Sequence, residues 1–303
     1  MNKTIKFLFL PGGGIWGAVQ PSAIKKLLPK QYDHIYGCSI GAINGSYLSQ
    51  FKRTEMESAT SSLKNMWTDI HDDVSSKEYY NLSAYNPIRI YKSSLHSDEI
   101  IKGIVKKNLP EINIHKKDNP VFHCPVTNME NGYVEIYNND QTDTKRFVDD
   151  IKPYIIASAS LPIILPFSTI GEKIYSDGGI LKYLSKFHTK ELSKNYDQIE
   201  IDIVHNRPKN YTTNIDKAEY DVNIGINGLN LIKVLTNSIQ KIDEKNLVRK
   251  LRKIKKKVII TNTYIKDTPE YRELQMTKTY NFNSEIVARI QNLEIDIEKQ
   301  ILN

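Results

Sequence analysis

The stretch Tyr36-Gly37-Cys38-Ser39-Ile40-Gly41-Ala42 fits the pattern G-x-S-x-G. The short run Asp33–Tyr36 before it predicts a strand, and the small and apolar residues from Ile40 to Phe51 predict a helix. A serine at such a strand-to-helix turn is typical of a nucleophile elbow, where the hydroxyl projects from a strained turn. Gly37 and Gly41 leave room for the flanking backbones to pass close together. Because ordinary glycine-containing turns also fit this pattern, a catalytic interpretation needs support from other stretches.

A glycine-rich loop precedes this turn. Thr4–Leu10 predicts a buried strand, after which come Gly12, Gly13 and Gly14. Three successive glycines let backbone N–H groups point into one concavity, which suits an anion. A P-loop would need a Gly-Lys-Ser/Thr next, which is not found. A dinucleotide site would need an acidic residue at the end of the next strand, about 20 residues on, but that strand instead runs into Ser39. We therefore interpret the three glycines as an oxyanion hole, with a simple glycine-rich turn as the alternative.

A carboxylate provides the third signal. Residues 174–176 predict a strand that ends in Asp177, and Gly178 and Gly179 follow as a supporting loop. A carboxylate in this position can reach the loop of a neighbouring strand, although a β-turn of the Asp-Gly type is a common alternative. Thr144–Ser160 predicts a helix whose last residues are small and can pack closely against an elbow.

In this order the three signals resemble those of the patatin-like phospholipases. The family's Ala-Ser-x-x-x-Pro block is also matched, by residues 157–162. The resemblance covers about residues 6–184. It implies a three-layer α/β/α sandwich with a central, mostly parallel sheet, and hydrolysis of lipid acyl esters by a Ser-Asp dyad without histidine. On this resemblance Ser39 is the nucleophile, Asp177 is the base, and the loop from Gly12 to Gly14 is the oxyanion hole.

The chain departs from the family pattern at two places. The family usually has Arg or Lys before the last glycine of the first motif, where this chain has Trp16. It also tends to have Asn and Pro after the Asp-Gly-Gly motif, where this chain has Tyr183 and Ser185. The first departure bears on how the oxyanion loop is held, and the second on the local shape after Asp177. Neither removes a group that the chemistry requires.

Length and charge limit the classes of protein further. The 303 residues, 40% of them hydrophobic, can bury a large core. We expect a single domain over 1–303, with 199–303 as its C-terminal part, where no family motif is found. The net charge of +7 and the pI near 9.0 suit an anionic partner. Since no nucleic-acid module is present, we expect a phospholipid or other acyl-ester substrate and peripheral contact with an anionic membrane surface, and no nucleic acid.

Cysteine and histidine usage gives further expectations. Cys38 and Cys124 make no disulfide framework, which fits a reducing compartment. The seven histidines are scattered, so we expect no metal and no other cofactor. No apolar run approaches the roughly 18 residues of a transmembrane helix, and the short apolar N-terminus lacks a signal-peptide cleavage site. We therefore expect a cytoplasmic protein.

The remaining elements are predicted from periodicity. The sequence predicts helices at Glu55–Ile70, Ser97–Asn108 with Ser97 as its cap, Gly228–Lys256 and Asn283–Leu302, a helical turn at Pro87–Tyr91, and strands at Val121–Thr127, Gly132–Tyr137, Ile199–Val204 and Val258–Thr263. The basic run Lys250–Lys257 predicts a solvated helix end, with contact to an anionic lipid surface as the alternative.

Two other functions compete with the Ser-Asp hydrolase. An ordinary α/β-hydrolase would use a Ser-Asp-His triad, and His188 and His205 follow Asp177 in the required order. A non-catalytic basic protein that binds membranes or nucleic acid would keep these motifs only as scaffold. The presence of both Ser39 and Asp177 favours the hydrolase.

Overall fold

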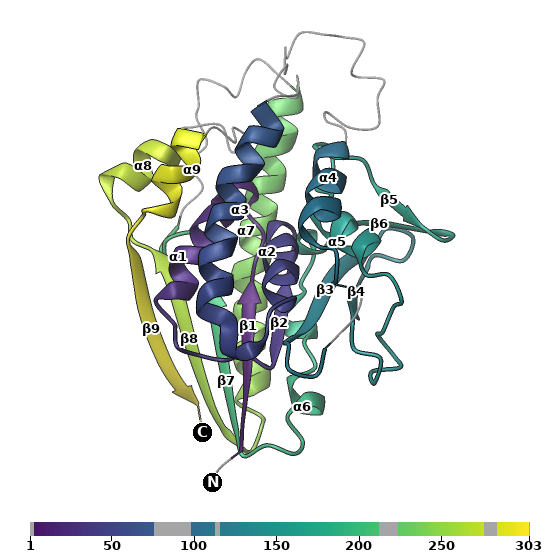
Figure 1. Ribbon diagram of the computed structural model, residues 1–303, viewed down its shortest axis with the longest axis vertical. Helices are drawn as coiled ribbons and strands as arrows, with labels where there is room; N and C mark the ends of the chain where they lie inside the picture. The colour runs from purple at the N-terminus through teal and green to yellow at the C-terminus, as the bar shows by residue number, and fades with distance from the viewer. Residues whose placement is uncertain (1–2, 76–97, 113–115, 212–223, 276–283, 303) are drawn as a thin grey trace.

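A computed structural model describes residues 3–75, 98–112, 116–211, 224–275 and 284–302, and these residues contain a single sheet (Figure 1). Its strands are β1 (Thr4–Leu10), β2 (His34–Gly37), β3 (Val121–Asn128), β4 (Tyr133–Asn138), β5 (Ser168–Ile170), β6 (Lys173–Asp177), β7 (Gln198–Val204), β8 (Lys257–Ile265) and β9 (Ile295–Leu302). The strand order is β5-β6-β3-β2-β1-β7-β8-β9, and β4 pairs with β3. The five central strands, from β3 to β8, are parallel, as predicted. The sheet as a whole is mixed, because β4, β5, β6 and β9 are joined by antiparallel pairings.

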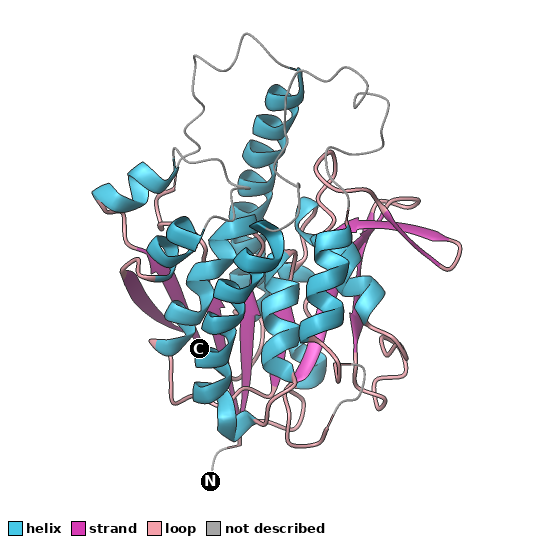
Figure 2. Cartoon of the chain, turned by 45° about the horizontal axis from the view of Figure 1, so that its top comes forward, coloured by secondary structure: helices cyan, strands magenta, loops and turns pink. Residues whose placement is uncertain are grey.

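Helices cover both faces of the sheet, which makes the three predicted layers (Figures 1 and 2). The α-helices are α1 (Gln20–Lys25), α2 (Ile40–Ser49), α3 (Met56–Ser75), α4 (Glu99–Asn108), α5 (Lys152–Ala159), α6 (Thr189–Leu192), α7 (Ile224–Leu251), α8 (Pro269–Gln275) and α9 (Ser284–Gln291). Short 3₁₀ helices are η1 (Gly14–Val19), η2 (Arg53–Glu55), η4 (Gly178–Ile180) and η5 (Leu184–Lys186). Helices α1, α2 and α3 lie on one face, and α7 lies on the other.

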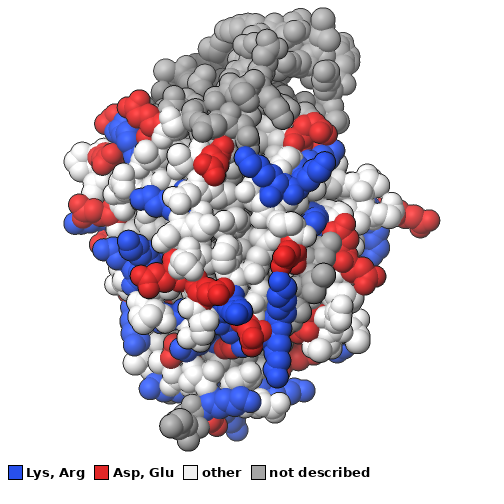
Figure 3. Space-filling view, viewed as in Figure 1, with Lys and Arg blue, Asp and Glu red and all other residues white. Residues whose placement is uncertain are grey.

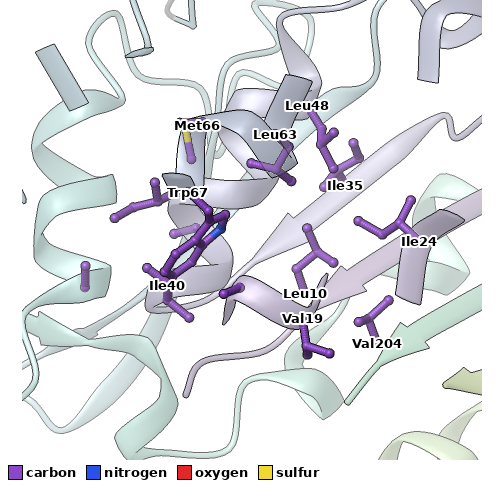
Figure 4. Packing of buried hydrophobic residues seen from close by; sticks show 14 of the residues in the cluster. Leu10, Val19, Ile24, Ile35, Ile40, Leu48, Leu63, Met66, Trp67 and Val204 are labelled. Carbon is purple, nitrogen blue, oxygen red and sulfur yellow. The ribbon is translucent and has the colours of Figure 1, made fainter. Parts of the chain in front are cut away.

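Two apolar clusters hold the layers together, one on each face of the sheet. Strand β1 contributes to both clusters, because its side chains alternate between the two faces of the sheet. Leu8 and Leu10 belong to the cluster under α1, α2 and α3 (Figure 4). Phe7 and Phe9 belong to the other cluster, with Leu247 of α7. The parallel strands are therefore apolar on both faces, as expected for a sheet covered on both sides.

The prediction of a helix over Thr144–Ser160 is wrong at its start, because α5 begins at Lys152. Residues 144–146 form a turn, after which Phe147 makes an isolated bridge to Asn138: the Asn138 N–H donates to Arg146 O at 2.9 Å, and the Val148 N–H donates to Asn138 O at 3.2 Å. Pro153 then occupies the first turn of α5, where a missing N–H costs nothing.

The prediction of a terminal helix over Asn283–Leu302 is also wrong. Helix α9 ends at Gln291, and Ile295–Leu302 is strand β9, paired along its whole length with β8. The isoleucines at 295, 297 and 301 fit an alternating pattern as well as a helical one. The open edge of β8 offers hydrogen-bond partners to all of this segment, which favours the strand.

The other predicted elements agree with the structure to within a few residues at their ends, apart from two points. Helix α4 begins at Glu99 with Asp98 at the capping position, and Ser97, the predicted cap, lies outside the described residues. The turn predicted at Pro87–Tyr91 lies outside the described residues.

Candidate active site

Strands β2 and β6 bring the predicted nucleophile and base together. Both strands pair with the same edge of β3, because β4 occupies its other edge. Strand β2 runs parallel to β3 with Tyr36 beside His123, whereas β6 runs antiparallel with Asp177 beside Val126. The two strands thus run toward each other and end about 10 Å apart along β3. The turn after β2 bridges this gap, so Ser39 meets Asp177.

Ser39 has a strained backbone at this turn. Its φ of 55° and ψ of −128° are rare for a residue with a side chain, and the residue is partly exposed between β2 and α2. Glycines make the turn possible: a Cβ on Gly41 would lie 1.9 Å from the Leu10 carbonyl oxygen, and one on Gly37 would lie 2.1 Å from the Gly41 oxygen. The backbones therefore pass too closely for any other residue at either position.

Asp177 is buried at the end of β6, with 2% of its surface exposed. Burial raises the pKa of Asp177 to about 6, since it penalises the charged form. The Ser39 side chain opposes this shift, as do two hydrogen bonds to the carboxylate, from the Gly179 N–H at 2.7 Å and from the Cys38 thiol at 3.9 Å. The group is therefore a stronger base than an ordinary aspartate, yet largely ionised at neutral pH.

Small residues at the end of α5 position both groups. The buried Ser158 hydroxyl accepts a hydrogen bond from the Ser39 N–H at 3.1 Å and donates to the Pro125 oxygen at 2.7 Å. The Ser160 carbonyl accepts from the Asp177 N–H at 3.0 Å. The sequence predicts only close packing for the small residues at the end of this helix. The hydrogen bonds are not predictable, because bonds between distant segments leave no local pattern.

The glycine loop lies directly against Ser39. A Cβ on Gly12 would come within 2.7 Å of the Ser39 Cβ and 3.3 Å of its Oγ. Gly13 has φ of 152° and Gly14 has φ of 56°, conformations that side chains rarely adopt. The loop then enters η1 at Gly14.

A buried polar network connects the glycine loop to helix α2. The Gln20 side chain donates to the Pro11 oxygen at 2.9 Å and accepts from Asn44 at 2.8 Å. Asn44 also donates to the Gly17 oxygen at 3.0 Å, and its own oxygen accepts from the Trp67 indole at 3.0 Å. The residues on both sides of the glycine loop are thus tied to the helix that begins at the elbow. Gln20 and Asn44 are 24 residues apart, so no local pattern in the sequence predicts that their side chains meet.

The two histidines of the alternative triad lie elsewhere. His205 stacks on Tyr264 with ring centroids 4.4 Å apart, and its Nε2 contacts the Asn262 oxygen at 3.0 Å. His188 Nδ1 lies 3.0 Å from the Lys186 oxygen. The described groups that influence the Asp177 carboxylate are instead Ser39, Gly179 and Cys38.

The basic run at the end of α7 lies at the opposite end of the sheet from Ser39. Lys257 pairs with Gln198 and Gln198 with Thr4, so the run meets the amino ends of these strands. Ser39 follows the carboxyl end of β2, about 20 Å away along the strands. Lys256 donates to the carbonyls of Ser193, Lys194 and Tyr196, and so has a structural role. Figure 3 shows positive and negative side chains interspersed on the opposite face of the molecule from α7.

The described residues contain no group of three or more His, Cys, Asp and Glu side chains arranged to hold a metal ion. None of the described helices combines the length and the apolarity that a bilayer crossing requires.

Comparison with known proteins identifies the family. The model of the family described as "Patatin-like phospholipase" matches residues 8–183, which include Ser39, Asp177 and the glycine loop. The chain belongs to the patatin-like phospholipase family. Membership implies lipid acyl hydrolase chemistry. No curated protein sequence matches significantly.

Among solved structures, this patatin-like protein is similar to VipD from Legionella pneumophila, at 14% identity and a TM-score of 0.38, over 99% of this chain and 68% of that one. It is also similar to the type III effector protein ExoU, at 12% identity and a TM-score of 0.29, over 97% of this chain and 55% of that one.

The two departures from the family pattern are accommodated by packing. The Trp16 ring, in place of a basic residue, packs against Tyr271 with centroids 5.3 Å apart, while the Trp16 N–H donates to the Gly13 oxygen at 3.2 Å. After Asp177, Tyr183 is buried and the Leu184 N–H donates to Asp243 of α7 at 2.6 Å. In this patatin-like protein, the glycine loop is therefore bonded to a tryptophan that an aromatic contact holds in place.

Proposed function

We propose that this patatin-like protein is a serine hydrolase of (phospho)lipid acyl esters that uses a Ser39–Asp177 dyad and an acyl-enzyme intermediate. The observation that carries the proposal is a serine in a strained elbow beside a buried carboxylate whose pKa is raised to about 6, a shift that the Ser39 side chain opposes. Such a carboxylate combines basicity with a fixed position beside the hydroxyl, which is what a nucleophile requires for activation.

The reaction proceeds in two steps. Asp177 takes the proton of the Ser39 hydroxyl as the oxygen attacks the ester carbonyl, and backbone N–H groups of Gly13 and Gly14 bind the developing oxyanion. The lipid alcohol leaves with the proton from Asp177. Water then attacks the acyl-enzyme, giving its proton to Asp177, and the fatty acid leaves as the Ser39 hydroxyl is restored.

The described geometry favours this dyad over both alternatives. A triad would need a histidine against Asp177, whereas His188 and His205 bond elsewhere. A non-catalytic scaffold would not need to keep a strained serine beside a desolvated carboxylate, because both features cost stability without function.

Product analysis on mixed phospholipid vesicles tests the proposal. Wild-type protein should release fatty acid and lysophospholipid, and Ser39→Ala should release neither while keeping the same circular dichroism spectrum. A fluorophosphonate probe should label the wild type, and peptide mapping should find the adduct on Ser39. Fatty-acid release by Ser39→Ala at the wild-type rate would refute the assignment of the nucleophile.

A further inference from the structure

Asn206 contacts the glycine loop from the side away from the elbow helix. Its side-chain amide donates to the Gly12 oxygen at 3.0 Å and to the Pro11 oxygen at 3.2 Å. The residue is 9% exposed and follows the carboxyl end of β7, which is beside that of β1. It lies outside residues 8–183, the part of the chain that the family model matches.

These two hydrogen bonds orient the loop. In a trans peptide the C=O and the following N–H point in opposite directions. Because the Gly12 oxygen points to Asn206, the Gly13 N–H points away from it. A Cβ on Gly13 would lie 3.1 Å from the Asn206 amide nitrogen, whereas one on Gly12 would lie 2.7 Å from the Ser39 Cβ. The loop thus passes between Asn206 and Ser39, and the Gly13 N–H is turned to the side of Ser39.

From this we infer that Asn206 is a positioning residue for the oxyanion hole. By binding the carbonyls of Pro11 and Gly12, it aims the Gly13 N–H at the oxyanion that forms on Ser39. Asn206 touches no reacting atom and acts through the peptide between Gly12 and Gly13. The inference rests on the proposed function, because it assigns Asn206 a part in that reaction.

The neighbours of Asn206 make it rigid. His205 is fixed by Tyr264 and Asn262, as described above, and Arg207 donates to Glu244 at 3.2 Å and to Asn237 at 2.9 Å. The amide itself has one possible orientation, because a flip would place its oxygen against two carbonyl oxygens. A rigid donor suits this role, since a displacement of about 1 Å at a catalytic group can cost about 10²-fold in rate.

Kinetics of two substitutions test the inference. Asn206→Ala removes the donor, and the nearly isosteric Asn206→Asp replaces it with an oxygen that repels both carbonyls. Each should lower kcat about 10–100-fold with KM changed less than about threefold, since the oxyanion is bound in the transition state. Asn139→Ala is the matched control: Asn139 is also buried and bonds to backbone at Ile112 and Phe122, remote from Ser39, and its kcat should be that of the wild type.

A second measurement does not depend on turnover. In amide NMR spectra of protein labelled at glycine, the Gly13 resonance should shift in both Asn206 variants and remain in place in Asn139→Ala. An unchanged kcat, or a raised KM at constant kcat, in a folded Asn206→Asp protein would overturn the inference. A wild-type protein without esterase activity would refute the proposed function instead, and an unmoved Gly13 resonance would then still overturn the orienting role.

Discussion

At the scale of single residues, the proposed chemistry depends on one carboxylate. Burial raises the pKa of Asp177, and the Ser39 side chain and the hydrogen bonds from Gly179 and Cys38 limit the shift. The charged form of Asp177 therefore favours the reaction but lowers the stability of the folded protein. A charged Asp177 is needed to accept a proton, yet its burial disfavours the charged form.

The pH dependence of hydrolysis follows from this shift. We expect kcat/KM for a neutral ester to rise with pH through about 6, as Asp177 loses its proton, and then to stay level through pH 8. A stopped assay with a soluble short-chain ester at constant ionic strength measures the profile. An inflection near pH 4, where an unperturbed aspartate titrates, would contradict the burial argument.

Asp177→Asn should inactivate the protein and make it more stable. The pKa of Asp177 is higher in the folded state than in the unfolded chain, so the folded state binds the proton more tightly and stability falls as pH rises from about 4 to about 6. Removing the charge should raise the free energy of unfolding at pH 7.5 by about 1–3 kcal/mol, and the gain should vanish near pH 4. Urea unfolding at both pH values measures this.

Asp143→Asn is the control of opposite sign. Burial alone would raise the pKa of Asp143, but hydrogen bonds from Arg146 and its charge lower it. Its ionised form therefore stabilises the fold above pH 4, and that contribution is lost as pH falls through the lowered pKa. Asp143→Asn should be less stable than wild type at pH 7.5. A loss of stability in Asp177→Asn as well would refute the sign argued for Asp177.

At the scale of elements, the proposed active site is a junction of three chain segments: the elbow between β2 and α2, the end of β6, and the glycine loop after β1. Close backbone approach joins them, and glycine is needed where a Cβ would overlap another backbone. Substitutions at these glycines therefore separate effects on chemistry from effects on folding.

Gly13→Ala should affect the chemical step. The φ of 152° at Gly13 is strained for alanine, and the new methyl group would press on the Asn206 amide. The loop should shift and misplace the N–H, so we expect kcat to fall about 10²–10³-fold with little change in KM. Steady-state kinetics on micellar substrate measures both constants. A raised KM at constant kcat would mean that the loop binds the ground-state lipid.

Gly41→Ala should affect folding. Its Cβ would lie 1.9 Å from the Leu10 oxygen, and neither backbone can move without separating α2 from β1. We expect a loss of about 3 kcal/mol or more, or no soluble protein. Gly103→Ala in α4 is the control, because it meets nothing within 4 Å and should gain about 0.5–1 kcal/mol of helix stability. Thermal unfolding compares the two, and equal melting temperatures would refute this account.

At the scale of the whole molecule, the basic run Lys250–Lys257 is far from the proposed active site. The basic run after α7 lies at the amino ends of the strands, and Ser39 lies at their carboxyl ends. A membrane that bound to the basic run would face the wrong end of the sheet for delivering lipid to Ser39. The structure therefore favours the solvated helix end over the lipid contact.

Charge reversal tests this separation. Lys253→Glu with Lys255→Glu changes two exposed side chains of the basic run. We expect the rate on anionic vesicles to change less than about twofold at 0.15 M salt, because exposed charges about 20 Å from the site are screened. The same double substitution on neutral vesicles is the reference. A rate loss of tenfold that is confined to anionic vesicles would restore the lipid-contact interpretation.

Local signals in the sequence predicted the elements that make the site. The glycine loop, the elbow and the Asp-Gly-Gly turn each combine a strand end with residues of special backbone freedom, and these are short-range properties. The five central strands were predicted for the same reason, because apolar runs bounded by turn residues define buried strands. The family followed from the order of these motifs.

Other features were decided by tertiary contacts between distant segments. Ile295–Leu302 fits a helix and a strand equally well by pattern, and the open edge of β8 selected the strand. Asp177 meets Ser39 because β2 and β6 occupy one edge of β3. Ser158, Asn44 and Asn206 bind the site through hydrogen bonds that span 119, 27 and 194 residues of chain. No local pattern encodes such pairs, because buried polar groups take whichever partners the folded backbone brings to them.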